Sequence, residues 1–298
     1  MNNKCGYVAV IGRPNVGKST LINQIIGEKV SIVTAKPQTT RHQILAIQTS
    51  QQGQILFIDT PGMHQGYKKA LNQYMNKAAN SAVLDVDLVL FLVESMKWTA
   101  DDEQALKSLK HINTPVILVI NKADLIKNKE KLLPYANDIG QKYNFKEIFY
   151  ISASKGKGVS GLEEKIYHYL PESENYFADD TLTDKSTRYL VSELIREQLM
   201  LRFHQELPYS LTVEIESFKD QGDIIHIHAL IWVEREIQKN MLIGKKGESL
   251  KQVGIHSRRE IQALVGKKVH LKLWAKVKSA WADDARLLQQ LGYKDEFE

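Results

Sequence analysis

The residues with the most recognisable chemistry lie near the start of the chain, in "GRPNVGKST" at 12–20. The stretch fits the pattern Gly-x-x-x-x-Gly-Lys-Ser, with Gly12, Gly17, Lys18 and Ser19 at its defined positions. It follows an apolar run and opens a helical pattern, which is the context in which this pattern binds nucleotide phosphates. Backbone N–H groups and the positive helix end would hold phosphate oxygens. Lys18 would reach the β- and γ-phosphates, and Ser19 would bind Mg²⁺.

A second group of metal and phosphate ligands is expected downstream. Asp59 ends the apolar run "QILFID", where a nucleotide-binding sheet presents another Mg²⁺ ligand, and the N–H of Gly62 can reach a γ-phosphate. The polar segment 33–43 has no apolar period, and its Thr40, or alternatively Thr39, could reach Mg²⁺ once a γ-phosphate is present. An ordinary polar loop is the alternative. The position favours a switch segment that becomes ordered with a triphosphate.

A guanine-binding group is predicted at the ends of two later apolar runs. In "NKAD", Asp124 can accept from both N1–H and the exocyclic amine of guanine, a pair of donors that adenine lacks. Asn121 can tie this loop to the phosphate loop, and the Lys122 stem can cover the base. In "ISAS", the N–H of Ala153, beside Ser152, could donate to guanine O6. Ligands bind at strand ends in such sheets, and the order of the motifs makes coincidence improbable.

The elements that position these residues occupy residues 1–170. Continuous apolar runs alternate with stretches of helical length, and the runs cover 7–12, 54–62, 87–95, 115–124 and 147–154. Continuous apolar strands separated by helices indicate a mostly parallel sheet that is buried on both faces. The fold class expected here is therefore a doubly wound α/β domain. Residues 171–186, with Pro171 and several acidic residues, are interpreted as an interdomain linker or an ordered loop.

The pattern changes in residues 187–298. A helix over 187–205 precedes two segments with alternating apolar residues, 210–218 and 224–233. A helical pattern, a loop, a second helical pattern and a third alternating segment at 267–277 follow. Alternation predicts half-buried strands, and Leu250, Val253, Ser257, Ile261 and Leu264 mark the apolar face of the second helix. The prediction is an α+β domain.

The loop between the two helices reads "GKKG", with Gly244, Lys245, Lys246 and Gly247. It does not follow a strand, and no Ser or Thr comes after a Gly-Lys pair, so it is not a second triphosphate loop. It resembles the Gly-x-x-Gly loop of type II KH domains, which clamps about four nucleotides of single-stranded RNA. Lys245 and Lys246 would meet phosphates. Lys251 and Arg258, seven residues apart on one helix face, would extend that surface.

Charge supports the same interpretation. The formal net charge of the chain is +5, whereas Arg235–Lys278 holds twelve basic and three acidic residues, a net of +9. The rest of the chain is therefore at 5 − 9 = −4. A basic segment of this kind is typical of a nucleic-acid contact, although single lysines in it are explained equally well by a solvated surface.

Several classes of protein are disfavoured. A single cysteine, Cys5, cannot form a disulfide framework, which favours a reducing compartment. The N-terminal apolar run is too short for a secretory signal, and the longest run, at 86–93, is far below the ~20 residues of a membrane helix. His226 and His228 share one strand face, but without a third ligand they are interpreted as surface residues rather than a metal site.

These motifs, with "QTTRH", "DTPG", "IGKKG" and "LKLWAKVKSAWADD", make nearly the whole chain resemble the Era family of bacterial GTPases. The resemblance implies GTP or GDP with Mg²⁺ as ligands. It also implies nucleotide contacts from Asn15, Val16 and Thr20. Hydrolysis would rely on Lys18, Thr40 and Gly62, and the metal would be held by Ser19, Thr40 and Asp59.

Met63 stands where related GTPases carry a glutamine that positions the attacking water. Slow intrinsic hydrolysis is therefore expected, with stimulation by K⁺ held partly by Asn15 as a hypothesis drawn from the resemblance. The resemblance further implies a cytoplasmic monomer that binds the 3′ end of small-subunit ribosomal RNA and assists assembly of the 30S subunit. Peripheral association with the inner membrane is also attributed to the family. Two alternatives stay open: an RNA-bound scaffold in which turnover is not essential, and a protein whose basic surface binds anionic lipid.

Overall fold

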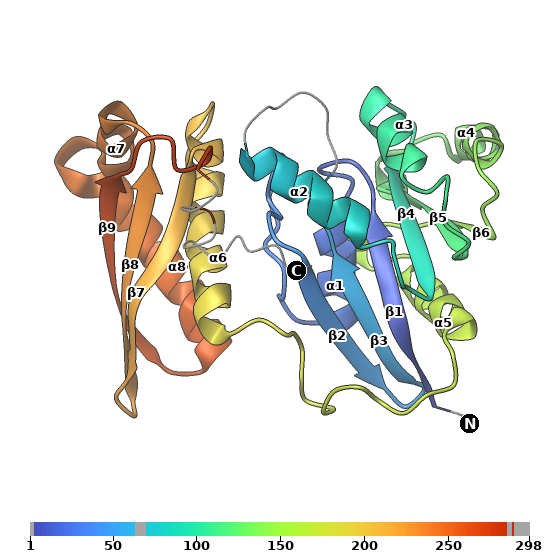
Figure 1. Cartoon of the computed structure of the whole chain (residues 1–298), viewed down its shortest axis with the longest axis horizontal. Coiled ribbons are helices and arrows are strands. Elements are labelled where there is room, and N and C mark those ends of the chain that lie inside the picture. The colour runs from blue at the N-terminus through green and yellow to red at the C-terminus, as the bar shows by residue number, and fades with distance from the viewer. Residues whose placement is uncertain (1–2, 63–69, 285–287, 289–298) are drawn as a thin grey trace. The chain divides into compact units, whose positions relative to one another are not determined.

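The chain divides into two compact units in the computed structural model, which describes residues 3–62, 70–284 and 288. The first unit comprises Met1–Lys68 with Asn72–Asp184, and the second comprises Lys69–Leu71 with Lys185–Glu298. The fold class predicted from the sequence, an α/β unit followed by a type II KH unit, is confirmed by the arrangement of strands and helices in the two units (Figure 1).

The first unit is built on a six-stranded sheet in the order β2-β3-β1-β4-β5-β6. Every neighbouring pair is parallel except β2 and β3, which are antiparallel. The strands are β1 (Lys4–Ile11), β2 (Ile44–Ser50), β3 (Gly53–Asp59), β4 (Leu88–Glu94), β5 (Val116–Asn121) and β6 (Glu147–Tyr150). The helices of this unit are α1 (Lys18–Ile26), α2 (Ala70–Ser81), α3 (Ala100–Lys107), α4 (Leu132–Gly140) and α5 (Val159–Tyr169).

Helices cover both faces of this sheet, with α1 and α2 on opposite faces in Figure 1. Alternate residues of β1, β4 and β5 form one core cluster with α2, α3 and α4. The remaining strand residues are also buried, and α1 contacts α5 and β3 behind them. Burial on both faces explains why these strands read as continuous apolar runs. It also leaves their carboxyl ends as the place where polar side chains can gather.

The sequence prediction missed strand β2. It placed only a polar segment between the first helix and a strand at 54–62, whereas β2 runs over Ile44–Ser50 and pairs with β3. β2 lies at the edge of the sheet, and its burial is uneven along its length, so its sequence carries no clean period. As a result, the segment 33–43 leads directly into an edge strand.

Residues 171–184, the greater part of the expected linker, run along the first unit and form isolated bridges to it at Glu172 and Thr183, with a turn between them. The buried side chain of Gln54 on β3 accepts from the N–H groups of Tyr176 (3.1 Å) and Phe177 (3.0 Å) and donates to the Phe177 carbonyl (3.1 Å). Further along, the N–H of Ile47 on β2 donates to the Leu182 carbonyl at 2.9 Å. The segment is therefore an ordered loop bound to the edge of the sheet.

The second unit contains a three-stranded sheet in the order β7-β8-β9, with β7 and β8 antiparallel and β8 and β9 parallel. The strands are β7 (Leu211–Asp220), β8 (Ile224–Val233) and β9 (Lys268–Val277), and the helices are α6 (Thr187–Arg202), α7 (Glu236–Ile243) and α8 (Glu248–Val265). Alternate residues of the strands form a core cluster with α6, α7 and α8. The element order is the one predicted, with one difference in burial: Leu264 is 38% exposed instead of facing the core.

No described helix is both long enough and apolar enough to cross a membrane.

Replacing Gln54 with Ala should release residues 175–178 from the sheet edge. Each net hydrogen bond contributes roughly 0.5–1.5 kcal/mol, so amide exchange at Tyr176 and Phe177 should accelerate by about tenfold or more. Hydrogen exchange read by mass spectrometry on peptides from 171–184 measures this. Gln52→Ala, at an exposed position two residues away, is the control and should leave the same peptides unchanged. Equal exchange in the two variants would contradict the assignment.

Candidate functional site

The loop between β1 and α1 has the geometry of a phosphate cradle. Gly17 has φ +103°, and a Cβ atom there would lie 2.2 Å from the side-chain nitrogen of Asn121. A side chain at this position is therefore excluded both by the backbone conformation and by the space available. The loop ends at the first turn of α1, where backbone N–H groups and the helix dipole attract anions.

Lys18 is folded across this loop. Its ammonium donates to the carbonyl oxygens of Gly12 (2.9 Å) and Arg13 (3.1 Å), and its side chain is buried. Burial lowers the pKa of Lys18 to about 8, although the nearby Asp59 carboxylate acts in the opposite direction. A buried cation with two weak carbonyl partners gains strongly from an anion placed in the loop.

Three oxygen ligands converge beside the loop, from three different elements. The hydroxyl of Ser19 donates to Asp59 Oδ2 at 2.8 Å and lies 3.0 Å from Thr40 Oγ1. Asp59 Oδ1 is buried and has no hydrogen-bond partner among the described residues. Burial raises the pKa of the Asp59 carboxyl, and the charge of Lys18 opposes this rise. Carboxylate and hydroxyl oxygens are the ligands that Mg²⁺ prefers, so the donor set fits a magnesium ion and Asp59 Oδ1 is free to bind it.

A cleft of about 50 Å³ joins these ligands to the segment 33–43. Its lining includes Asn15, Gly17, Lys18, Ser19, Thr20, Thr40 and Gly62 from the predicted site, together with Thr34, Lys36 and Thr39. Asn15 donates from its side-chain amide to the carbonyl of Ala35 at 2.8 Å. The structure thus brings most of the predicted phosphate ligands to one cleft, whereas Asp59 does not line it and reaches it through its bond with Ser19.

The predicted base-reading residues also meet the phosphate loop. The side-chain amide of Asn121 donates to the Val16 carbonyl at 2.8 Å, which is the tie between the two loops that the sequence predicted. Its oxygen accepts from the N–H groups of Lys122 (2.8 Å) and Ala153 (3.0 Å). The N–H of Ala153 is therefore already paired, and donation to a base would have to be shared with Asn121.

Asp124, the residue predicted to distinguish guanine, is partly buried beside Ser152 and Ala153. Its Oδ2 forms an ion pair with the ammonium of Lys155 at 3.0 Å. The sequence analysis did not identify Lys155, which follows "ISAS" by one residue. The ion pair favours the carboxylate form that a guanine with two donors requires.

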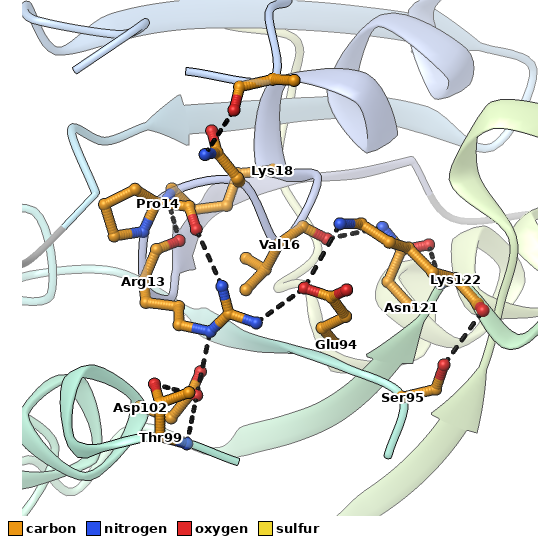
Figure 2. A network of polar contacts seen from close by, with 12 residues as sticks. Arg13, Pro14, Val16, Lys18, Glu94, Ser95, Thr99, Asp102, Asn121 and Lys122 are labelled. Atoms are coloured by element: carbon orange, nitrogen blue, oxygen red, sulfur yellow. Dashed lines mark hydrogen bonds and ion pairs between the residues drawn. The ribbon is translucent and has the colours of Figure 1, made fainter. Parts of the chain in front are cut away.

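A buried ion-pair network lies under the phosphate loop (Figure 2). The guanidinium of Arg13 donates from Nε to Asp102 Oδ2 (3.0 Å) and from a terminal nitrogen to Glu94 Oε2 (2.7 Å). Asp102 is fully buried and also accepts from the N–H and hydroxyl of Thr99, which caps α3. Arg13 thereby fixes the phosphate loop to the start of α3 and the end of β4.

Glu94 extends this network to the base-reading loop. Its Oε2, already paired with Arg13, lies 3.3 Å from the ammonium of Lys122, as Figure 2 shows. Burial favours the protonated acid, yet the bond from Arg13 and the charge of Lys122 hold the pKa of Glu94 below its ordinary value. Ser95, the next residue, donates to the Lys122 carbonyl at 3.0 Å. One carboxylate thus links two nucleotide-binding motifs that are about a hundred residues apart in sequence, and the sequence analysis did not identify it.

The second unit presents "GKKG" between α7 and α8. Gly244 has φ +72°, and a Cβ atom there would lie 2.6 Å from the Cβ of Ser249, so this position requires glycine. Lys245 and Lys246 are exposed, and Lys246 itself takes a left-handed conformation with φ 52°. The loop therefore turns sharply and points its cations outward.

A groove of about 320 Å³ begins at this loop. The predicted residues Gly247, Lys251 and Arg258 line it, and its remaining walls are Leu250, Gly254 and Ile255 of α8 with Leu271 and Leu273 of β9. The sequence analysis predicted the cations but not the apolar walls, which depend on the packing of β9 against α8. A groove with an apolar wall and a cationic rim can hold unpaired bases with their phosphates outward.

One further cation reaches the same loop from another helix. Arg202, the last residue of α6, donates from Nε to the hydroxyl of Ser249 at 2.9 Å, and its side chain is exposed. Its terminal guanidinium nitrogens remain available for a phosphate. The sequence offered little indication that Arg202 lies next to this loop, because Arg202 precedes Ser249 by forty-seven residues.

Two predictions concern other residues. Met63, expected to replace a catalytic glutamine, lies outside the described residues. His226 and His228, interpreted from the sequence as surface residues, are partly exposed on β8, and Nδ1 of His226 lies 3.2 Å from Nδ1 of His270.

Comparisons with known proteins agree with this geometry. Residues 7–122 match the family model described as "50S ribosome-binding GTPase", and residues 206–282 match that of the KH domain. Relatives named "GTPase Era" from Ectopseudomonas mendocina and Haemophilus ducreyi are 48% and 51% identical over 293 residues. The matches cover 98% of this chain, and 98% and 96% of those relatives.

Two solved structures are similar over almost the whole chain. One is Era in complex with MgGDPNP and nucleotides 1506–1542 of 16S ribosomal RNA, with a TM-score of 0.95. The other is a variant of Aquifex aeolicus Era bound to GDP and AlF4⁻, with a TM-score of 0.94. Each is 38% identical in sequence, and each comparison covers 98% of this chain and 100% of the other.

Removing Asp102 should destabilise the first unit strongly, because a buried guanidinium would lose one of its two carboxylate partners. Asp102→Ala is expected to lower the free energy of unfolding by roughly 3 kcal/mol, as for other broken buried ion pairs. Urea denaturation measures it. Glu147→Ala, which breaks the partly exposed pair with Lys165 (2.7 Å), is the matched control and should cost less than about 1 kcal/mol. Equal losses of unfolding free energy in the two variants would show that burial of the Arg13 network adds no stability.

Proposed function

The chain belongs to the Era family of GTPases, and from this premise we propose that it is a GTP-hydrolysing switch that binds single-stranded RNA of the small ribosomal subunit. GTP or GDP with Mg²⁺ would occupy the cleft of the first unit, and RNA would occupy the groove of the second. The solved relative that holds MgGDPNP and 16S ribosomal RNA supports both assignments. The domain boundaries proposed are 1–170, 171–186 and 187–298.

The observation that carries the nucleotide proposal is the meeting of Ser19, Thr40 and Asp59 beside the buried ammonium of Lys18. These residues would hold the metal and the phosphates, whereas Asn121 and Asp124 would hold the base. Mg²⁺, when bound, neutralises charge on the β- and γ-phosphate oxygens. Lys18 would place a second positive charge there, and the N–H of Gly62 would donate to the γ-phosphate.

Slow intrinsic hydrolysis is part of the proposal. A methionine at position 63 cannot orient an attacking water by hydrogen bonding, because its thioether is only a weak acceptor. Lys18, Thr40 and Gly62 would then stabilise the transferring phosphoryl group without a side chain that acts on the water. An external partner or the bound RNA would supply the acceleration.

A physical path for coupling runs from Thr40 to the second unit. Thr40 lies four residues before β2, and the N–H and carbonyl of Leu45 on that strand pair with Asp184 (3.2 Å) and Thr183 (2.7 Å). Asp184 is the last residue of the first unit. Ordering of Thr40 on the metal would therefore act on a strand that holds the last residues before the RNA-binding unit.

The coupling can be tested by measuring RNA affinity with a non-hydrolysable GTP analogue, with GDP and without nucleotide. Typical coupling free energies of 1–3 kcal/mol predict affinities that differ by about 5- to 150-fold. Because coupling is reciprocal, bound RNA should change the GTP-analogue affinity by the same factor. Thr183→Val, which removes the bond to Leu45, should reduce the difference. RNA affinities that are identical in all three nucleotide states would remove the switch from the proposal.

Stimulation by potassium is a finer proposal that rests on Asn15. This side chain bonds the carbonyl of Ala35 through Nδ2, and its Oδ1 has no partner among residues 3–62 and 70–284. Oδ1 could therefore contribute a ligand to a monovalent cation next to the phosphates. Hydrolysis should be faster in KCl than in NaCl, and Asn15→Ala should remove the difference. Equal rates of the unaltered protein in the two salts would refute it.

The setting proposed is the cytoplasm, where a monomer would assist assembly of the 30S subunit through its 3′ ribosomal RNA. Family membership and the RNA-bound relative are what support this. Peripheral contact with the inner membrane belongs to the same proposal, and the resemblance to the family is what supports it.

A further inference from the structure

Among the described residues, helices cover one face of the sheet of the second unit and no helix packs on the other face, where Leu230 is nevertheless buried. Odd-numbered residues of β8, from Ile225 to Val233, are buried in the core cluster with α6, α7 and α8. In Figure 1, α6 and α8 lie together on one side of this sheet. Side chains alternate along a strand, so the even-numbered residues of β8 and β9 point to the other side. We call that side the outer face, defined by the even-numbered residues 226–232 and 268–276.

The outer face of β9 is cationic with one aromatic residue among the cations. Its positions are Lys268, His270, Lys272, Trp274 and Lys276, all exposed. They contain no acidic residue. Trp274 is 53% exposed, although tryptophan usually buries most of its ring when nothing recruits it to the surface. It is the only large apolar residue exposed on this face of the described unit.

A second tryptophan is held rigidly beside it. The indole N–H of Trp232 on β8 donates to Glu214 Oε2 at 2.7 Å, which fixes the ring orientation. The ammonium groups of Lys276 and Lys278 lie 5.9 and 5.2 Å from the centre of that ring. The neighbouring strand β7 carries two exposed acids, Glu214 and Glu216, and this bond engages the first of them. The platform is preorganised, so a ligand need not order it.

We propose that this outer face is a second RNA contact, at which an unpaired base stacks on Trp274 and phosphates meet Lys272 and Lys276. The proposal rests on RNA binding by the second unit and extends it to a surface distinct from the groove. Aromatic rings flanked by cations are the usual platform for single-stranded nucleic acid, because every base has a stacking face.

The path between the two surfaces is short. β9 is an edge strand of the sheet, and the groove is lined by its Leu271 and Leu273, whereas Lys272 and Trp274 point the opposite way. A strand of RNA that leaves the groove over this edge would reach the outer face after crossing the thickness of one strand. The same four consecutive residues would then contact RNA on both sides.

Lipid and protein partners fit the face less well. A membrane contact favours a continuous apolar area that enters the lipid, and Trp274 is isolated among lysines. A protein contact favours a core depleted in charge, whereas a lysine recurs here at every fourth residue of β9, at 268, 272 and 276. Charge complementarity therefore favours a polyanion.

The test uses the full chain and two unstructured RNAs, one of about six nucleotides that the groove can hold and one of about sixteen. Trp274→Ala should weaken binding of the longer RNA by about tenfold, since stacking on one aromatic ring contributes about that much. Binding of the shorter RNA should not change. Trp274→Phe, which keeps an aromatic ring, should restore most of the loss.

Charge and location give independent measurements. Lys272→Glu should lower the affinity of the chain for the longer RNA and reduce the dependence of that affinity on salt. Lys110→Glu, an exposed lysine of the first unit, is the matched control and should do neither. Ultraviolet crosslinking of the longer RNA should label the peptide that contains Trp274.

The outcomes separate this inference from the function it rests on. If each RNA binds the Trp274→Ala variant as tightly as it binds the unaltered chain, the second contact is overturned and the groove remains as the RNA site. Failure of the unaltered chain to bind either RNA would remove the proposed function itself. A third outcome is that the chain binds anionic phosphatidylglycerol vesicles and that Lys272→Glu abolishes this binding but leaves the affinity for the longer RNA unchanged. That result would assign the face to a lipid surface and overturn the proposal.

Discussion

The side-chain amide of Asn121 is the contact on which the nucleotide cleft depends. It donates to Val16 in the phosphate loop and accepts from Lys122 and Ala153 in the two base-reading loops. One N–H and both acceptor positions of this buried amide are used to keep three loops at fixed separation, and leaving any one of these groups unpaired would be costly. The same amide explains the glycine at position 17, because its nitrogen occupies the space where a side chain would be.

The Arg13 network reinforces this arrangement from below. A guanidinium with a planar set of donors can hold two carboxylates at once, which a lysine could not do with the same geometry. Glu94 forms ion pairs with both Arg13 and Lys122, so a displacement of the phosphate loop would also shift the base-reading loop. The residues proposed to hold the phosphates and those proposed to hold the base are therefore anchored to one shared, partly buried carboxylate.

The edge strand of each sheet, β2 in the first unit and β9 in the second, contacts more than one functional segment. β2 lies at the edge of the first sheet, follows the segment with Thr40, and holds residues 182–184 through backbone and side-chain bonds. β9 lies at the edge of the second sheet and presents one face to the groove and the other to solvent. At β2, the bonds to residues 182–184 also protect the edge of the sheet from uncontrolled pairing.

The sequence by itself determined the motifs, their order along the chain and the two fold classes. It could do so because carboxyl ends of parallel strands meet, and because alternation and helical periodicity report which face is buried. The Asn121 tie and the cations at "GKKG" followed from that reasoning. Only the tertiary structure decided contacts that depend on register and on packing between distant segments. Arg13 and Asp102 are 89 residues apart, β2 lacks a clean period, and Lys155 and Arg202 reach their partners through space. The exposure of Trp274 was likewise settled by which side of the sheet the helices cover, since an alternating strand pattern marks two faces but does not say what packs on each.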